Sequence, residues 1–137
     1  MKRFYKFWFF FCVGWGYLMS QPLADAETKA ALHMTHVLAA LPLSALNVAL
    51  LLAIEVWRAR PAKLPAPNIE LRPWNMPTGV MQFVLITFFF SGAWGLLFGI
   101  ALGSNDFRVP LFFLMMGIGG LAGLLGFHRA FPSRFAP

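Results

Sequence analysis

The polar side chains best suited to chemistry lie in an apolar segment at residues 30–57. At helical geometry they fall within a sector of about 100°, so they form one polar stripe. They are His33, His36, Ser44, Asn47 and Glu55. Polar groups at membrane depth are costly and usually face a helix bundle or a water-filled cavity. One interpretation of the stripe is therefore a track for protons, a small solute or a quinone head.

A structural interpretation explains the same stripe by depth. Its histidines and Glu55 lie near the ends of the segment, where water and lipid headgroups reach them. Ser44 and Asn47 would then join neighbouring helices through hydrogen bonds. We favour this interpretation, which predicts that Asn47 faces the protein interior, on the same side as His36 and Ser44. Pro42 is predicted to lie on the opposite side and to face away.

His33 and His36 also suggest a metal or haem site, although the motif is weak. The two axial ligands of a haem approach the iron from opposite sides. Two histidines three residues apart on one helix therefore cannot both bind it, and His128 lies at the far end of the last apolar segment. A haem shared with another subunit, or a copper or zinc site that includes Glu27, stays open as an alternative. The chain by itself implies no cofactor and no metal.

We expect a protein that is not an enzyme. The sequence shows no nucleophile, base and acid at one depth, and no close pair of carboxylates in a spanning segment. It also shows no glycine-rich phosphate loop after a strand.

The composition is that of an integral membrane protein. Of the 137 residues, 59 % are hydrophobic and 12 % are charged, whereas about a quarter of the residues of a soluble domain are charged. The net charge of +6 does not indicate a nucleic-acid partner, because the basic residues stand at the ends of apolar segments rather than on one solvated face. Membrane lipid is the expected environment.

Three apolar segments predict an all-α fold, a bundle of three transmembrane helices. Each is close to or above the length of about 20 residues that crosses a bilayer. The expected spans are about 30–57, 80–102 and 110–127. A loop with many prolines, residues 58–79, connects the first two spans. Residues 27–137 would form a single domain.

The N-terminal segment, residues 1–26, is ambiguous. It combines a basic start, an apolar stretch and an Ala-x-Ala sequence, Ala24 to Ala26. This is the layout of a cleaved signal peptide, but the apolar stretch could also stay in place as a signal-anchor and form a fourth span. The two alternatives are equally compatible with the sequence.

Small residues recur at every fourth position from Thr87 onward and define a long groove, as in a glycine zipper. These residues are Thr87, Ser91, Gly95, Gly99 and Gly103. Close packing through small residues brings helices together in lipid. A second small face follows in the last span, at Gly119, Ala122, Gly123 and Gly126. Because the intervening turn is short, we predict that Gly95 and Gly99 contact the helix at residues 110–127.

The basic residues alternate along the chain in a positive-inside pattern. Nine Lys and Arg residues lie in the start of the chain, the proline-rich loop and the C-terminal tail, and two lie in the segments between. Such a bias places the basic segments in the cytoplasm. We therefore expect an inner-membrane, multi-pass protein whose loop 58–79 and C-terminus are cytoplasmic.

These observations favour an accessory or assembly subunit of a larger membrane complex that acts by helix packing. Its partners would be other membrane subunits or further copies of itself. The first alternative is a self-assembling pore or small-solute transporter that uses His36, Ser44 and Asn47. The second is a respiratory subunit that contributes one haem or quinone contact.

Overall fold

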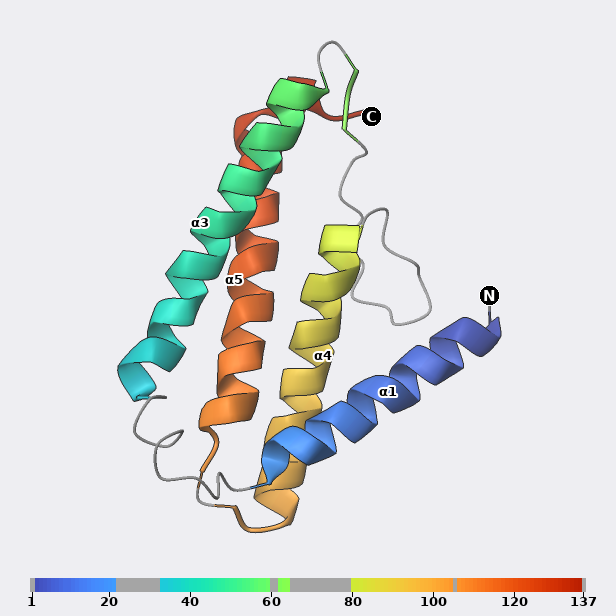
Figure 1. Ribbon diagram of the computed structural model, residues 1–137, viewed down its shortest axis with the longest axis vertical. Helices are drawn as coiled ribbons and strands as arrows, with labels where there is room; N and C mark the ends of the chain where they lie inside the picture. The colour runs from blue at the N-terminus through green and yellow to red at the C-terminus, as the bar shows by residue number, and fades with distance from the viewer. Residues whose placement is uncertain (1, 22–32, 60–61, 65–79, 105, 137) are drawn as a thin grey trace.

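The computed structural model is all-α, as the sequence predicts (Figure 1). It describes residues 2–21, 33–59, 62–64, 80–104 and 106–136. Its helices are α1 (Lys2–Ser20), α3 (Met34–Arg58), α4 (Val80–Ala101), α5 (Arg108–Ala130) and a short 3₁₀ helix, η1 (Pro132–Arg134). Within the described residues, extended pairing is limited to one isolated bridge, between Leu64 and Phe135.

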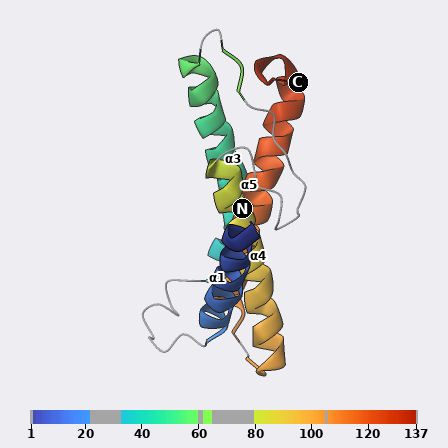
Figure 2. The same cartoon turned by 90° about the vertical axis from the view of Figure 1, so that its right-hand side faces the viewer.

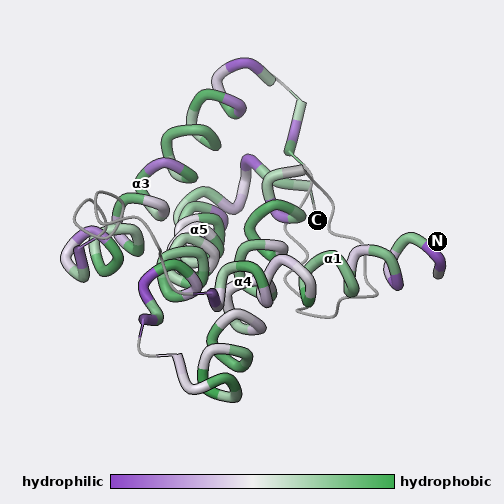
Figure 3. Tube along the Cα trace, turned by 60° about the horizontal axis from the view of Figure 1, so that its bottom comes forward, coloured by the Kyte–Doolittle hydropathy of each residue, from purple (hydrophilic) through white to green (hydrophobic). Residues whose placement is uncertain are grey.

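Three of the helices, α3, α4 and α5, are long and apolar enough to cross a membrane. The bounds of two helices differ from the predicted spans: α3 begins at Met34 and not at residue 30, and α5 begins before residue 110 and extends to Ala130. Pro110 is tolerated there because the amides of the first helical turn have no partner within the helix. Hydrophilic residues gather mainly toward the ends of the helices, as Figure 3 shows. The predicted cleavage region and most of the proline-rich loop lie outside the described residues.

The helices form an open row rather than a closed bundle. α5 lies in the centre, with α3 on one side and α4 on the other, and α1 crosses the far side of α4 (Figures 1 and 2). In the part of the chain that the structure describes, the one extensive helix neighbour of α3 is α5. One whole side of α3 is therefore left uncovered by the described residues.

The two ends of the row differ in what connects the helices. At one end, the residues after α3 pair with the C-terminal tail: the Leu64 amide donates to the Arg134 carbonyl oxygen at 3.0 Å, and the Ala136 amide donates to the Leu64 carbonyl oxygen at 2.8 Å. Phe135 is buried against the rings of Phe127 and His128. The turn between α4 and α5 lies at the opposite end (Figure 1). The start of the loop 58–79 and the C-terminus therefore share one end of the molecule.

Candidate functional site

The small-residue groove of α4 is occupied over three rungs by the N-terminal helix α1. On α1, a matching set at four-residue spacing meets it: Trp8, Cys12 and Gly16. The Trp8 Nε1 donates a hydrogen bond of 2.9 Å to Thr87 Oγ1. A Cβ atom on Gly16 would lie 2.6 Å from Trp94 Cβ and 2.8 Å from the Gly95 amide nitrogen. The expectation that the last span fills this groove is wrong at Thr87 and Ser91, because α1 covers that side of α4.

At the middle rung, two small polar side chains are sealed from solvent. Cys12 is 1 % exposed and Ser91 is 0 % exposed, and the thiol lies beside the hydroxyl. Ser91 Oγ makes no hydrogen bond of ordinary geometry to the described residues, and a thiol is only a weak partner. Both residues therefore act here as small packing residues.

Gly95 contacts both neighbours of α4. A Cβ atom there would lie 2.6 Å from Pro110 Cβ on α5 and 3.3 Å from the Gly16 carbonyl oxygen on α1. The predicted contact between Gly95 and the last span is therefore confirmed. Gly92, which the four-residue ladder does not include, packs directly on the backbone of α5, since its Cβ would lie 2.6 Å from the Leu114 amide nitrogen and 2.8 Å from the Pro110 carbonyl oxygen. The signal for Gly92 is its three-residue spacing from Gly95, which is also a helix-face spacing.

The last two rungs of the ladder meet the turn and not a helix. A Cβ on Gly99 would lie 2.9 Å from a ring carbon of Phe107, the residue that precedes α5. Gly103 has a φ of +69°, and the Ser104 amide bonds to the Gly99 carbonyl oxygen at 2.8 Å. This is a glycine-terminated helix end. Gly103 therefore ends α4 and is not part of the groove, and the contact predicted for Gly99 is only partly correct.

The glycines of α5 divide between two neighbouring helices. Gly117 and Gly120 face α4, where a Cβ would meet the Phe89 backbone and the Leu85 side chain. Gly119 and Gly123 face α3, and a Cβ on Gly119 would overlap the Leu41 carbonyl. The second small face of the sequence therefore packs mainly on α3, which corrects the expected pairing with α4. A Cβ on its member Gly126 would meet no neighbouring helix within 4 Å among the described residues, and Ala122 is exposed.

The polar stripe is split by the contact between α3 and α5. Ser44 Oγ donates a hydrogen bond of 2.7 Å to the Met116 carbonyl oxygen on α5, so Ser44 joins two helices as expected. Asn47 is exposed, and its side chain makes no hydrogen bond to the described residues. Its predicted position in the interior is wrong, because the edge of the α3–α5 contact runs between Ser44 and Asn47. Pro42 is exposed, as predicted.

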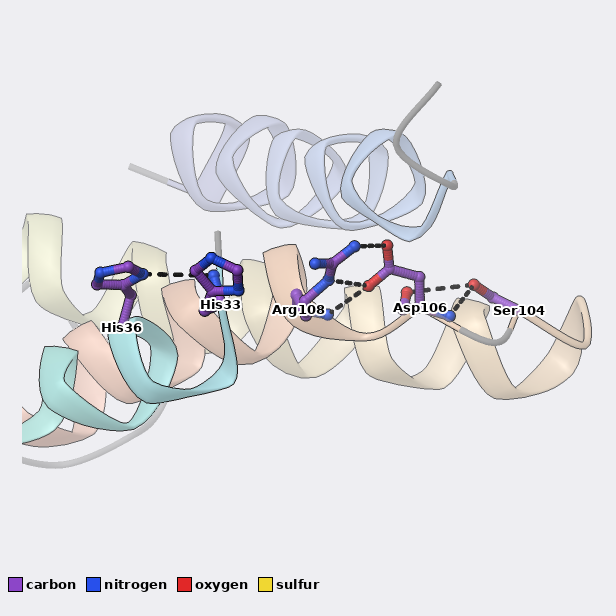
Figure 4. A network of polar contacts seen from close by, with 5 residues as sticks. All are labelled: His33, His36, Ser104, Asp106 and Arg108. Carbon is purple, nitrogen blue, oxygen red and sulfur yellow. Dashed lines mark hydrogen bonds and ion pairs between the residues drawn. The ribbon is translucent and has the colours of Figure 1, made fainter. Parts of the chain in front are cut away.

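The two histidines, His33 and His36, cap the start of α3. The His33 amide donates to His36 Nδ1 at 3.3 Å (Figure 4), which satisfies one free donor of the first turn. Both side chains are exposed, with ring centroids 5.6 Å apart. The described residues contain no group of three or more metal ligands, and Glu27 lies outside them. At the other end of α3, Glu55 is exposed and lies 3.8 Å from Arg58.

A hollow of about 950 Å³ lies at the end of the row that holds the α4–α5 turn. Its wall includes Tyr17, Gln21 and a polar turn in which Arg108 Nε and Asp106 Oδ1 are 2.9 Å apart (Figure 4). Asp106 also accepts from the Arg108 amide at 3.2 Å. This pair was not among the predicted site residues, although an acidic residue just before a helix is a recurring cap signal. Its bonds fix the turn between α4 and α5.

Known proteins do not indicate a function for this chain. No protein-family model matches this chain, and no curated protein or solved structure is detectably similar to it.

Proposed function

We propose that this protein is an accessory or assembly subunit of a larger membrane complex and that it acts by helix packing. The observation that carries the proposal is the uncovered side of α3. That side holds a carboxamide, Asn47, close to the middle of a helix of 25 residues. Hydrocarbon offers no partner to an amide, which has two donors and an acceptor to satisfy. A helix of another protein chain on this side would supply one.

The interior of the molecule supports the same proposal. Thr87 accepts from Trp8 and Ser44 donates to α5, so these hydroxyls serve contacts between helices. The glycines of α4 and α5 serve close backbone approach. These hydroxyls and most of these glycines thus hold one helix to another, which is the work of a packing subunit.

A photo-crosslinking experiment tests this proposal. Leu43 lies on the Asn47 side of α3, and Leu38 is equally exposed, at 56 % for each, but about 140° away around the helix. We expect benzoylphenylalanine at position 43 to form protein adducts in native membranes and the same probe at position 38 to form mainly lipid adducts. Lipid adducts alone at both positions would overturn the proposal.

A pore or small-solute transporter is the second candidate, and one observation favours it. Asn47 and His36 are both exposed on α3, so several copies could direct them toward a shared lumen. Flux assays of purified protein in liposomes test this function. Solute or proton flux that Asn47→Leu abolishes while assembly persists would favour the pore over the accessory subunit.

We also propose the inner membrane as the location, with the loop 58–79 and the C-terminus in the cytoplasm. The support is the charge pattern together with the pairing of Leu64 and Phe135 at one end of the row. In a Cys12→Ser background, single cysteines at Lys63 and Ser104 are exposed to an impermeant thiol reagent on intact cells. We expect labelling at position 104 and protection at position 63, and the reverse pattern would invert the orientation.

A further inference from the structure

We propose that the uncovered side of α3 is a homodimer interface, in which two copies of this chain pair their α3 helices in parallel and join their Asn47 side chains. The inference rests on the proposed function for its site and names the partner that occupies it. The larger complex would then contain this chain as a pair.

The first observation is a heptad pattern on that side of α3. Four residues at alternating spacings of four and three follow the a and d positions of a coiled coil. They are Leu43, Asn47, Leu50 and Ile54. The three apolar members are 56 %, 55 % and 45 % exposed, so they are not buried by the residues that the structure describes. We call these four residues the α3 seam.

The seam is separate from the contact that α3 makes with α5. The residues of α3 that are buried on α5 are Val37, Ala40, Val48 and Leu52, and their mean direction is about 115° from that of the seam at helical geometry. Ala40 would continue the heptad toward the start of the helix, but it is 6 % exposed. The seam therefore begins at Leu43 and extends toward Ile54.

Asn47 indicates why the occupant is a second copy. A carboxamide carries both a donor and an acceptor, so two of them satisfy each other across a twofold axis. Copies inserted with the same orientation place Asn47 at the same depth, which aligns the two amides without further adjustment. A single asparagine at an a position is known to select register and oligomeric state in coiled coils. An unrelated partner would need a polar group at that same depth.

Disulfide mapping in native membranes tests the inference with the full-length chain in a Cys12→Ala background. Single cysteines replace Leu43 or Leu50 on the seam, and Leu38→Cys is the control of equal exposure off the seam. After oxidation with copper phenanthroline, we expect a dimer band at positions 43 and 50 and little at position 38. Equal cross-linking at 38 and 43 would overturn the proposal, because it would indicate random collisions.

Substitutions of Asn47 in the Leu50→Cys background test the amide itself. Intramembrane hydrogen bonds contribute on average about a factor of three each, so the loss of two in Asn47→Leu should weaken dimerisation about eightfold. Asn47→Gln keeps the amide and should retain most of the dimer. Unchanged dimerisation in Asn47→Leu would overturn the role of the amide.

The failures of the two proposals are distinguishable. Benzoylphenylalanine adducts at position 43 with a different protein, without a disulfide dimer, would overturn the homodimer and leave the accessory function supported. Lipid adducts alone, without a disulfide dimer, would overturn both.

Discussion

Two helix faces of this molecule differ in whether their polar and small residues are buried. On α4, the groove of Thr87, Ser91 and Gly95 is closed by α1, with a hydrogen bond from Trp8 and close backbone contact at Gly16. On α3, the seam around Asn47 is exposed along its length. The first face holds the chain together, whereas the second is available to a partner. The comparison indicates that small residues at regular spacing serve contacts within this chain, and that the outward amide serves contacts between chains.

The largest expected effect comes from a bulky side chain placed in the contact between α3 and α5. Gly119→Leu should destabilise the fold by about 3 kcal/mol or more, since a side chain there meets the Leu41 backbone, which cannot move away. Gly126→Leu is the matched control on the same helix, with nothing within 4 Å of its Cβ. Unfolding in mixed micelles of rising SDS content measures both. Equal stability of the two variants would contradict the observed division of the α5 glycines.

Gly99→Leu provides a second comparison with Gly119→Leu. A Cβ on Gly99 would lie 2.9 Å from Phe107 Cε1. The Phe107 side chain can rotate away, whereas a backbone cannot. We expect a smaller loss of stability than in Gly119→Leu, in the lower part of the range of about 1–3 kcal/mol for overpacking. A loss as large as that of Gly119→Leu would show that the turn is as rigid as the helix contact.

The docking of α1 on α4 should depend on Gly16. Gly16→Ala brings a methyl group within 2.8 Å of the Gly95 amide nitrogen, whereas nothing lies within 4 Å of a Cβ on Gly14. We expect a loss of about 1–3 kcal/mol for Gly16→Ala and none for Gly14→Ala. The readout is disulfide formation between native Cys12 and Ser91→Cys, which should fall in the Gly16 variant. Absence of this disulfide in the parent would contradict the pairing of α1 with α4.

Ser44 and Asn47 give the smallest and most discriminating contrast. Ser44→Ala removes the bond to the Met116 carbonyl and should lower the stability of the single chain by about 0.6 kcal/mol. Asn47→Leu should leave that stability within about 0.5 kcal/mol, as expected of a surface substitution, while it weakens the contact between chains. Micelle unfolding measures the first quantity and disulfide dimerisation the second. If Asn47→Leu destabilised the single chain more than Ser44→Ala, Asn47 would belong to the interior after all.

The apolar segments of the sequence were sufficient to predict the three long helices α3, α4 and α5, but they left the role of residues 1–26 open. Hydrophobic segments are local features that depend on few neighbours, whereas the role of Gly103 as the end of α4 was not predicted. The four-residue spacing of small residues also correctly indicated that α4 packs closely on another helix. The partner of that face could not be read from spacing, because α1 and α5 both carry residues small enough to approach it.

Which side of each helix meets which neighbour became clear from the packing of the helices and not from their sequences. Periodicity states which residues share a face, but it does not state where a contact between two helices ends. Ser44 and Asn47 belong to one sector of about 100°, and the edge of the α3–α5 contact falls between them. The same limit applies to α5, whose glycines serve α4 and α3 from two adjoining faces. The direction of a helix face is a property of the assembled helices, because it is the fit of whole surfaces that sets the rotation of each helix about its axis.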